Sequence, residues 1–132
     1  MEIYLWVGFG SALGGIARYA VSGLVAGWIG ETFPFGTLTV NVLGSFGIGL
    51  FAAVTAPDGR LLVDPAVRQF AMVGLFGGFT TFSSFSLQTL ALIQDGEWPA
   101  AVANVLASVT ACLIGVWLGT MAGLYWNRLP GG

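Results

Sequence analysis

The chain of 132 residues is 56% hydrophobic and only 8% charged, with a mean hydropathy of +0.87. This composition is far too apolar for a soluble domain of this size and indicates an integral membrane protein. Four basic and six acidic side chains give a net charge of −2, and the absence of histidine excludes both an imidazole metal ligand and a histidine general base.

Four apolar stretches are each long enough for the roughly 20 residues that a membrane-spanning helix needs. They cover about residues 3–29, 35–56, 66–94 and 98–126. The connections between them are short, so no extramembrane domain is expected. The first stretch is interpreted as a retained span, because Glu2 stands where a signal peptide has positive charge and the apolar run is too long. We predict a single all-α membrane domain over residues 1–132.

The arginines indicate the orientation only weakly. With four spans, both termini and the second connection share one side, which carries Arg60, Arg68 and Arg128, while the other connections carry no basic residue. This favours cytoplasmic termini. Arg18 lies in the distal part of the first span and can extend toward the opposite side, which reduces the difference. The orientation therefore stays open at this stage.

The second span carries a polar stripe. Thr37, Asn41 and Ser45 recur every four residues and therefore lie on one helical face. An Asn carboxamide is costly in lipid, so Asn41 should face protein, water or a permeating solute. The alternative is that it joins helices by a hydrogen bond, as polar residues in membrane bundles often do.

Residues 74–86 of the third stretch read Gly-Leu-Phe-Gly-Gly-Phe-Thr-Thr-Phe-Ser-Ser-Phe-Ser. Adjacent glycines loosen a helix and hydroxyls offer the backbone alternative hydrogen bonds, so we predict that the third helix is broken here. Unpaired carbonyls cost several kcal/mol each in hydrocarbon, so a break is tolerated only where it is buried in protein, faces a wet cavity or coordinates an ion. The segment therefore points to transport.

Phenylalanines recur every three residues in the same segment, at Phe76, Phe79, Phe82 and Phe85. A phenyl ring is positive at its edge, so edges turned toward a small anion can replace part of its hydration shell. The simpler alternative is that the four rings pack in an apolar core. The periodicity alone does not decide between the two.

The fourth span carries a polar stripe of Asn104, Ser108 and Cys112 beside a stripe of small residues. Asn104 is expected either in a solute pathway or in a hydrogen bond between helices. The small residues, with residues 10–14 and 45–49 of the first two spans, predict close helix contacts. Because such a thin bundle hardly encloses a pore, we expect a homo-oligomer. The stripe consists of Ala103, Ala107, Ala111, Gly115, Gly119 and Gly123.

Ionisable residues are nearly absent from the spans. Apart from Arg18, every charged side chain is terminal or lies in a connection. Proton-coupled transport and small dual-topology cation exporters use a buried carboxylate, which is missing here. Catalysis is not expected, because no carboxylate pair faces inward. Neutral donors without carboxylates favour an anion over a cation as the permeating solute.

Three motifs follow one another along the chain. They are Gly14-Gly-Ile-Ala-Arg18-Tyr19, Pro34-Phe-Gly-Thr37-Leu-Thr-Val-Asn41, and the decapeptide 77–86, Gly-Gly-Phe-Thr-Thr-Phe-Ser-Ser-Phe-Ser. In this order, within four short spans, they resemble the small fluoride channels of bacteria, the Fluc or CrcB family. The resemblance covers the whole chain.

The resemblance implies two antiparallel subunits in a dual-topology homodimer, with two fluoride pores along the subunit boundary. It also implies that the third helix breaks at the dimer centre, where carbonyls of Gly77 and Thr80 from both subunits hold a structural sodium ion that is not transported. The fluoride pathway that the resemblance implies consists of Asn41, Phe82, Phe85 and Ser108. The polar stripes add Thr37 and Asn104 to the expected pathway.

The chain departs from the family pattern at two positions. Many members have a glutamate where this chain has Gln88, and an aromatic position of the polar track is Asn104 here. Arg18 matches a basic position of the family. Its role is either that of a vestibule charge or that of a structural hydrogen-bond donor.

The expected function is passive export of toxic fluoride across the bacterial inner membrane, and not an enzymatic reaction. HF enters cells from acidic surroundings and dissociates inside, and a negative interior favours exit of an anion by about 2.3 kcal/mol per 100 mV. The expected partners are fluoride, the lipid bilayer and a second copy of the chain, with no nucleic acid. The alternatives are a small dual-topology drug or cation exporter and a membrane assembly subunit without transport activity.

Overall fold

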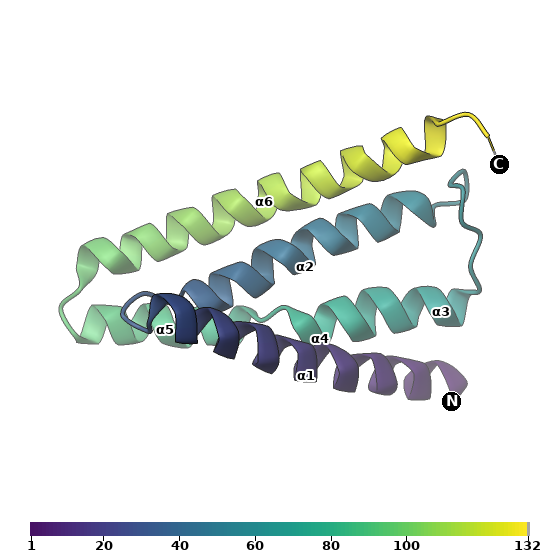
Figure 1. The fold of residues 1–132 in the computed structure, drawn as a ribbon. Coiled ribbons are helices and arrows are strands. Elements are labelled where there is room, and N and C mark those ends of the chain that lie inside the picture. Colours follow the sequence, from purple (N-terminus) through teal and green to yellow (C-terminus); the bar gives the residue numbers. More distant parts are fainter. Residues whose placement is uncertain (132) are drawn as a thin grey trace.

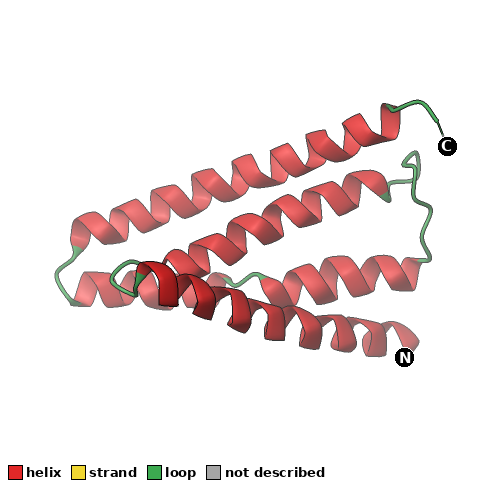
Figure 2. Cartoon of the chain, viewed as in Figure 1, coloured by secondary structure: helices red, strands yellow, loops and turns green. Residues whose placement is uncertain are grey.

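The computed structural model describes residues 1–131, which form helices and connecting loops without a strand (Figures 1 and 2). The first two helices are α1 (Glu2–Ile29) and α2 (Phe35–Val54). The third span is made of α3 (Pro65–Gln69), the π-helical stretch η1 (Phe70–Phe76), α4 (Gly77–Phe79) and α5 (Phe82–Gln94), and the fourth is α6 (Trp98–Arg128).

Four segments are long and apolar enough to cross a membrane, namely Glu2–Ile29, Phe35–Val54, Pro65–Gln94 and Trp98–Arg128. Three of them contain the predicted apolar stretches in full, whereas the second ends at Val54 and the predicted stretch ends at residue 56. The chain is a multi-pass membrane protein. Both ends of the described chain lie at one end of the bundle together with the α2–α3 connection, while the α1–α2 and α5–α6 connections lie at the other (Figure 1).

The predicted break in the third helix is confirmed, and it lies at Thr80 and Thr81 (Figure 2). Both residues are extended, with φ −90° and ψ 159° at Thr80 and φ −154° and ψ 116° at Thr81. The helix before the break is irregular already, since η1 is wound as a π-helix up to Phe76. Such π-helical turns are common at functional sites in membrane and soluble proteins.

Glycines bring α1 against the first half of the third span. A Cβ atom added to Gly74 would lie 3.0 Å from the Cα of Gly10, and one added to Gly78 would lie 2.7 Å from the carbonyl oxygen of Ser11. The backbones touch because these positions carry a glycine or a small serine, which is how small residues pack membrane helices. The close contact predicted for residues 10–14 is therefore confirmed.

A second row of glycines packs α6 on α2. A Cβ atom on Gly115 would lie 3.2 Å from the Val42 carbonyl oxygen, and one on Gly123 would lie 3.0 Å from that of Leu50. Between them, Gly119 touches the backbone of Phe46. Only the second half of the predicted small stripe packs in this way, because Ala103 near the start of α6 is exposed.

The α2–α3 connection is fastened to the end of α6. Arg60 donates a hydrogen bond from Nη1 to the Trp126 carbonyl oxygen at 3.1 Å, and its guanidinium lies 5.2 Å from the centroid of the Trp126 ring. Asn127 accepts from the Arg60 amide at 3.1 Å and donates to the Ala53 carbonyl oxygen at 3.0 Å. A cation at a helix C-terminus is favourable, so the charge of Arg60 stabilises this end of the bundle.

The glycine packing predicts the effect of a single added methyl group. Gly119→Ala places a Cβ atom against the Phe46 carbonyl oxygen, so α2 and α6 must separate, at a cost of about 1–3 kcal/mol. Gly27→Ala is the matched control, because nothing lies within 4 Å of the added atom. In detergent, the thermal unfolding midpoint should fall for Gly119→Ala and stay or rise for Gly27→Ala. Equal midpoints for the two variants would contradict this packing.

Candidate functional site

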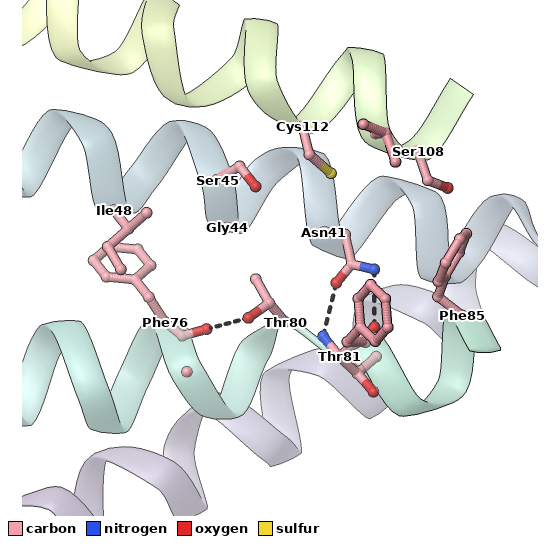
Figure 3. Close-up of a pocket in the computed structure, with 13 residues that line it drawn as sticks. Asn41, Gly44, Ser45, Ile48, Phe76, Thr80, Thr81, Phe85, Ser108 and Cys112 are labelled. Atoms are coloured by element: carbon pink, nitrogen blue, oxygen red, sulfur yellow. Dashed lines mark hydrogen bonds between the residues drawn. The ribbon is translucent and has the colours of Figure 1, made fainter. Parts of the chain in front are cut away.

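A cavity of about 310 Å³ lies between α2, the broken third span and α6 (Figure 3). Its lining is largely apolar, with amide and hydroxyl groups on the α2 side and at the break and with no carboxylate. We call it the central cavity. It is lined by Asn41, Gly44, Ser45, Ile48, Phe76, Gly77, Thr80, Thr81, Phe82, Phe85, Ser108, Val109 and Cys112.

A second, more polar cavity of about 710 Å³ lies at the end of the bundle where α1 meets α2, and we call it the mouth cavity. Arg18 lines it from α1, Ser84 and Gln88 line it from α5, and two carboxylates, Glu31 and Asp95, lie in its wall. Thr81 lines both cavities. The break in the third helix is therefore the point at which the two cavities meet.

Asn41 holds the backbone at this meeting point. Its Oδ1 accepts a hydrogen bond from the Thr81 amide at 2.7 Å, and its Nδ2 donates to the Thr81 carbonyl oxygen at 3.0 Å (Figure 3). The carboxamide thus bonds to both polar groups of one extended residue. One N–H of Nδ2 remains for another acceptor, because the group carries two. Asn41 therefore both joins helices and faces the central cavity.

Thr81 also begins the second half of the broken helix. Its Oγ1 accepts a hydrogen bond from the Ser84 amide at 3.2 Å, as an N-cap side chain does. The start of α5 therefore lies beside both cavities, with the positive end of its dipole directed at the break. The sequence did not single out Thr81 as a site residue, although threonine is a favoured N-cap residue.

The break leaves four carbonyl groups, those of residues 77–80, without their helical partners. In a continuous helix Gly77 would bond to the Thr81 amide and Thr80 to the Ser84 amide. Those two amides donate to Asn41 Oδ1 and to Thr81 Oγ1 instead. Free carbonyl oxygens at the C-terminal end of a half-helix are ligands that suit a sodium ion. The residues present therefore fit the structural sodium that the resemblance implies.

Arg18 reaches the break from α1. Its Nε donates a hydrogen bond to the Gly78 carbonyl oxygen at 3.0 Å, and the side chain is half-buried in the wall of the mouth cavity. Of the two roles left open by the sequence, the hydrogen bond is present, and the guanidinium also borders a cavity. Hydrogen bonds to charged groups contribute about 1.5–3 kcal/mol, which is more than neutral ones.

The phenylalanines divide into two groups. Phe76, Phe82 and Phe85 line the central cavity, and the rings of Phe82 and Phe85 lie 5.3 Å apart at 53°. Phe79 does not line it but packs on α2, with a ring atom 3.3 Å from where a Cβ on Gly44 would lie. Phe82 is 77% exposed, so one wall of the cavity is open in a single chain.

The polar residues of α6 lie in different surroundings. Asn104 is 1% exposed, donates to Thr89 Oγ1 of α5 at 2.9 Å and accepts from Ser108 Oγ at 3.3 Å. It joins α5 to α6 and lines neither cavity. Ser108 does line the central cavity, while buried Thr37 lines the mouth cavity.

Gln88 stands out among the residues of the mouth cavity. Its Oε1 is buried and has no hydrogen-bond partner in the described part of the chain. A buried polar atom of this kind normally has a partner, so a donor such as a water molecule is expected beside it. The sequence marked Gln88 only as a departure from the family pattern.

Comparisons with known proteins identify the relatives of this chain. Residues 5–120 match the family model described as "CrcB-like protein, Camphor Resistance (CrcB)". A protein of Opitutus terrae named "Fluoride-specific ion channel FluC" is 57% identical, with 99% of each chain covered. Proteins with the same name from Rhodospirillum rubrum and Paramagnetospirillum magneticum are each 56% identical, covering 95% and 97% of this chain and 97% and 100% of their own.

The clamp at the break predicts that Asn41 contributes to stability. Asn41→Leu removes both bonds to Thr81 and leaves a part-buried amide and carbonyl unpaired, so the free energy of unfolding should fall by about 1–3 kcal/mol for each group. Ser45→Ala, one turn along the same stripe, lines the same cavity without a bond to the break and should change stability little. Thermal unfolding in detergent measures both, and an unchanged midpoint for Asn41→Leu would contradict the clamp.

Proposed function

Because the chain belongs to the CrcB-like protein family, we propose that it is a passive, fluoride-selective channel of the bacterial inner membrane. The observation that carries the proposal is the central cavity, where amide and hydroxyl groups meet phenylalanine rings and no carboxylate is present. Such a lining attracts an anion. Its narrow and partly apolar walls disfavour large anions, because few donors replace their hydration.

Fluoride passes from the mouth cavity to the central cavity at Thr81, which both share. Arg18 supplies positive charge in the mouth cavity, whose wall also holds the carboxylates of Glu31 and Asp95, and the start of α5 presents the positive end of its dipole at the break. In the central cavity the remaining N–H of Asn41 and the edges of Phe82 and Phe85 take the place of water around the ion. Ser108 lies on the α6 side of the same cavity.

The chain acts as a channel and not as an enzyme or an ion-coupled pump. No carboxylate lies in the central cavity to carry a proton, and the membrane potential itself drives an anion outward by about 2.3 kcal/mol per 100 mV. Fluoride that enters an acid-exposed cell as HF is thereby removed. The same missing carboxylate disfavours the drug or cation exporter considered from the sequence.

We further propose that two antiparallel copies form the channel and share one structural sodium ion at the break. The open wall at Phe82 supports a second subunit, because a largely exposed ring beside a cavity leaves that cavity incomplete. The unpaired Gly77 and Thr80 carbonyl groups support the sodium, which supplies positive charge to oxygens that would otherwise remain unsatisfied in the membrane.

Purified protein in proteoliposomes loaded with both fluoride and chloride tests the function directly. When valinomycin is added to let potassium cross the membrane, fluoride should leave the proteoliposomes rapidly while chloride stays. Ion-selective electrodes measure both anions. Release of both ions, or of neither, would reject a fluoride-selective channel. A sodium gradient should drive no fluoride uphill, because the sodium is structural.

The rings of Phe82 and Phe85 should contribute to fluoride flux because they are aromatic. Phe82→Ile and Phe85→Ile keep an apolar side chain but remove the ring edge, so fluoride flux should fall at least tenfold, with methionine at the same positions having a smaller effect. Phe79→Ile is the control, since that ring packs on α2 outside the cavity. Flux that follows side-chain volume alone would show that the rings only pack.

Substitutions at the neighbouring residues Gly77 and Gly78 distinguish an effect on dimer formation from an effect on the folding of one subunit. A Cβ on Gly77 finds only the Met72 carbonyl oxygen, at 3.8 Å, whereas one on Gly78 meets Ser11. Gly77 also has ordinary helical angles, φ −63° and ψ −40°. Gly77→Val should therefore leave the subunit folded but impair dimer formation and its sodium dependence.

Gly78→Ala should instead lower the unfolding midpoint of the subunit itself. Dimer formation is measured by cross-linking and light scattering in detergent, with sodium or with a large organic cation. A Gly77→Val protein that remains a fully active, sodium-dependent dimer would exclude the close approach of a second copy at this face.

A further inference from the structure

We propose that Arg18 is a positioning residue that keeps the third helix broken and thereby sets the direction of the Gly77 and Thr80 carbonyl groups. The inference rests on the proposed sodium site and concerns a side chain that does not itself touch the ion. It starts from one contact, the hydrogen bond at 3.0 Å from Arg18 Nε to the Gly78 carbonyl oxygen.

The state that competes with the break is a continuous helix. In that state the Gly78 carbonyl would accept from the Phe82 amide, and the carbonyl groups of Gly77 and Thr80 would regain their own partners. A half-helix that ends within the membrane is stable only when other groups satisfy its last carbonyls. Arg18 donates a hydrogen bond to the Gly78 carbonyl group, so this carbonyl has a partner even though the helix ends.

The contact is specific because the backbone around Gly78 is fixed. Its Cα side lies against Ser11 of α1, where an added Cβ would be 2.7 Å from a carbonyl oxygen. Gly78 therefore faces α1, while Gly77, one residue earlier in the helix, faces the open side. Arg18 also lies on α1, so one helix holds Gly78 through both packing and a hydrogen bond.

Three side chains from different parts of the chain thus bond to backbone groups between Gly78 and Ser84. Arg18 binds the Gly78 carbonyl, Asn41 binds the amide and carbonyl of Thr81, and the Thr81 hydroxyl binds the Ser84 amide. These side chains leave the carbonyl groups of Gly77, Phe79 and Thr80 without a bond, and those of Gly77 and Thr80 are the ligands of the proposed sodium. Arg18 brings the only charge among the three, and a cation suits the C-terminal end of a half-helix.

Two substitutions separate the hydrogen bond of Arg18 from its charge. Glutamine has its Nε2 at the same number of bonds from the backbone as the arginine Nε, so Arg18→Gln keeps a donor for Gly78 and loses the charge. Arg18→Lys keeps the charge but moves the donor one bond further out. Arg18→Met loses both and keeps an unbranched side chain of similar length.

The experiment measures the sodium concentration that gives half of the maximal thermal stabilisation of the full-length protein in detergent, with N-methyl-D-glucamine as the replacing cation. Arg18→Gln should stay within about threefold of the parent concentration, and Arg18→Met should require at least tenfold more sodium. Arg60→Met is the control, because Arg60 also bonds a helix carbonyl but does so at the C-terminal end of α6 and not at the break. It should lower the unfolding midpoint without changing the sodium dependence.

The inference is overturned if Arg18→Gln shifts the sodium dependence as much as Arg18→Met, or if Arg18→Met shifts nothing. Should Arg18→Met fail to fold, Arg18→Gln must still lie closer to the parent than Arg18→Lys does, and the reverse order overturns the inference. If sodium does not stabilise the parent protein against thermal unfolding, both the inference about Arg18 and the proposed sodium site are overturned. Fluoride flux of that same parent decides the proposed channel function independently.

Discussion

The structure depends on one constraint, which is that backbone groups inside a membrane need partners within the protein. A helix meets this requirement by itself, but the third span loses its helical hydrogen bonds at Thr80 and Thr81. The polar side chains at the centre of the bundle are placed where they replace the missing bonds. Asn41 and Arg18 lie on different helices, and both form hydrogen bonds with the backbone at the break.

Glycine is what allows these side chains to reach their targets. The contacts of Gly10 and Gly14 with the backbone of residues 70–79 bring α1 close enough for Arg18 to bond Gly78. On the other side, Gly44 of α2 makes room for Thr80 and Phe79, which places Asn41 beside Thr81. The small residues therefore serve the site as well as the packing, since a methyl group at these contacts would move the helices apart.

The site is built from both sides of the break but is closed on only one. Thr81 lines both the mouth cavity and the central cavity, α2 contributes to the walls of both, and α6 contributes only to the central cavity. On the outer side Gly77 and Phe82 are exposed, while the residues between them are half-buried. The proposed second subunit would cover this exposed surface beside the proposed sodium site.

The sequence by itself determined the four spans, the broken third helix and the glycine contacts of the first span, because these follow from hydropathy, residue type and spacing along one helix. It also marked Asn41 and Arg18, but it left two roles open for each. Only the tertiary structure decided that Asn41 clamps Thr81, that Asn104 joins α5 to α6, and that Phe79 lies apart from Phe82 and Phe85. Helical periodicity gives the face on which a residue lies, whereas its partner depends on how closely and at what height two helices pack, and that is set by contacts between residues far apart in the chain.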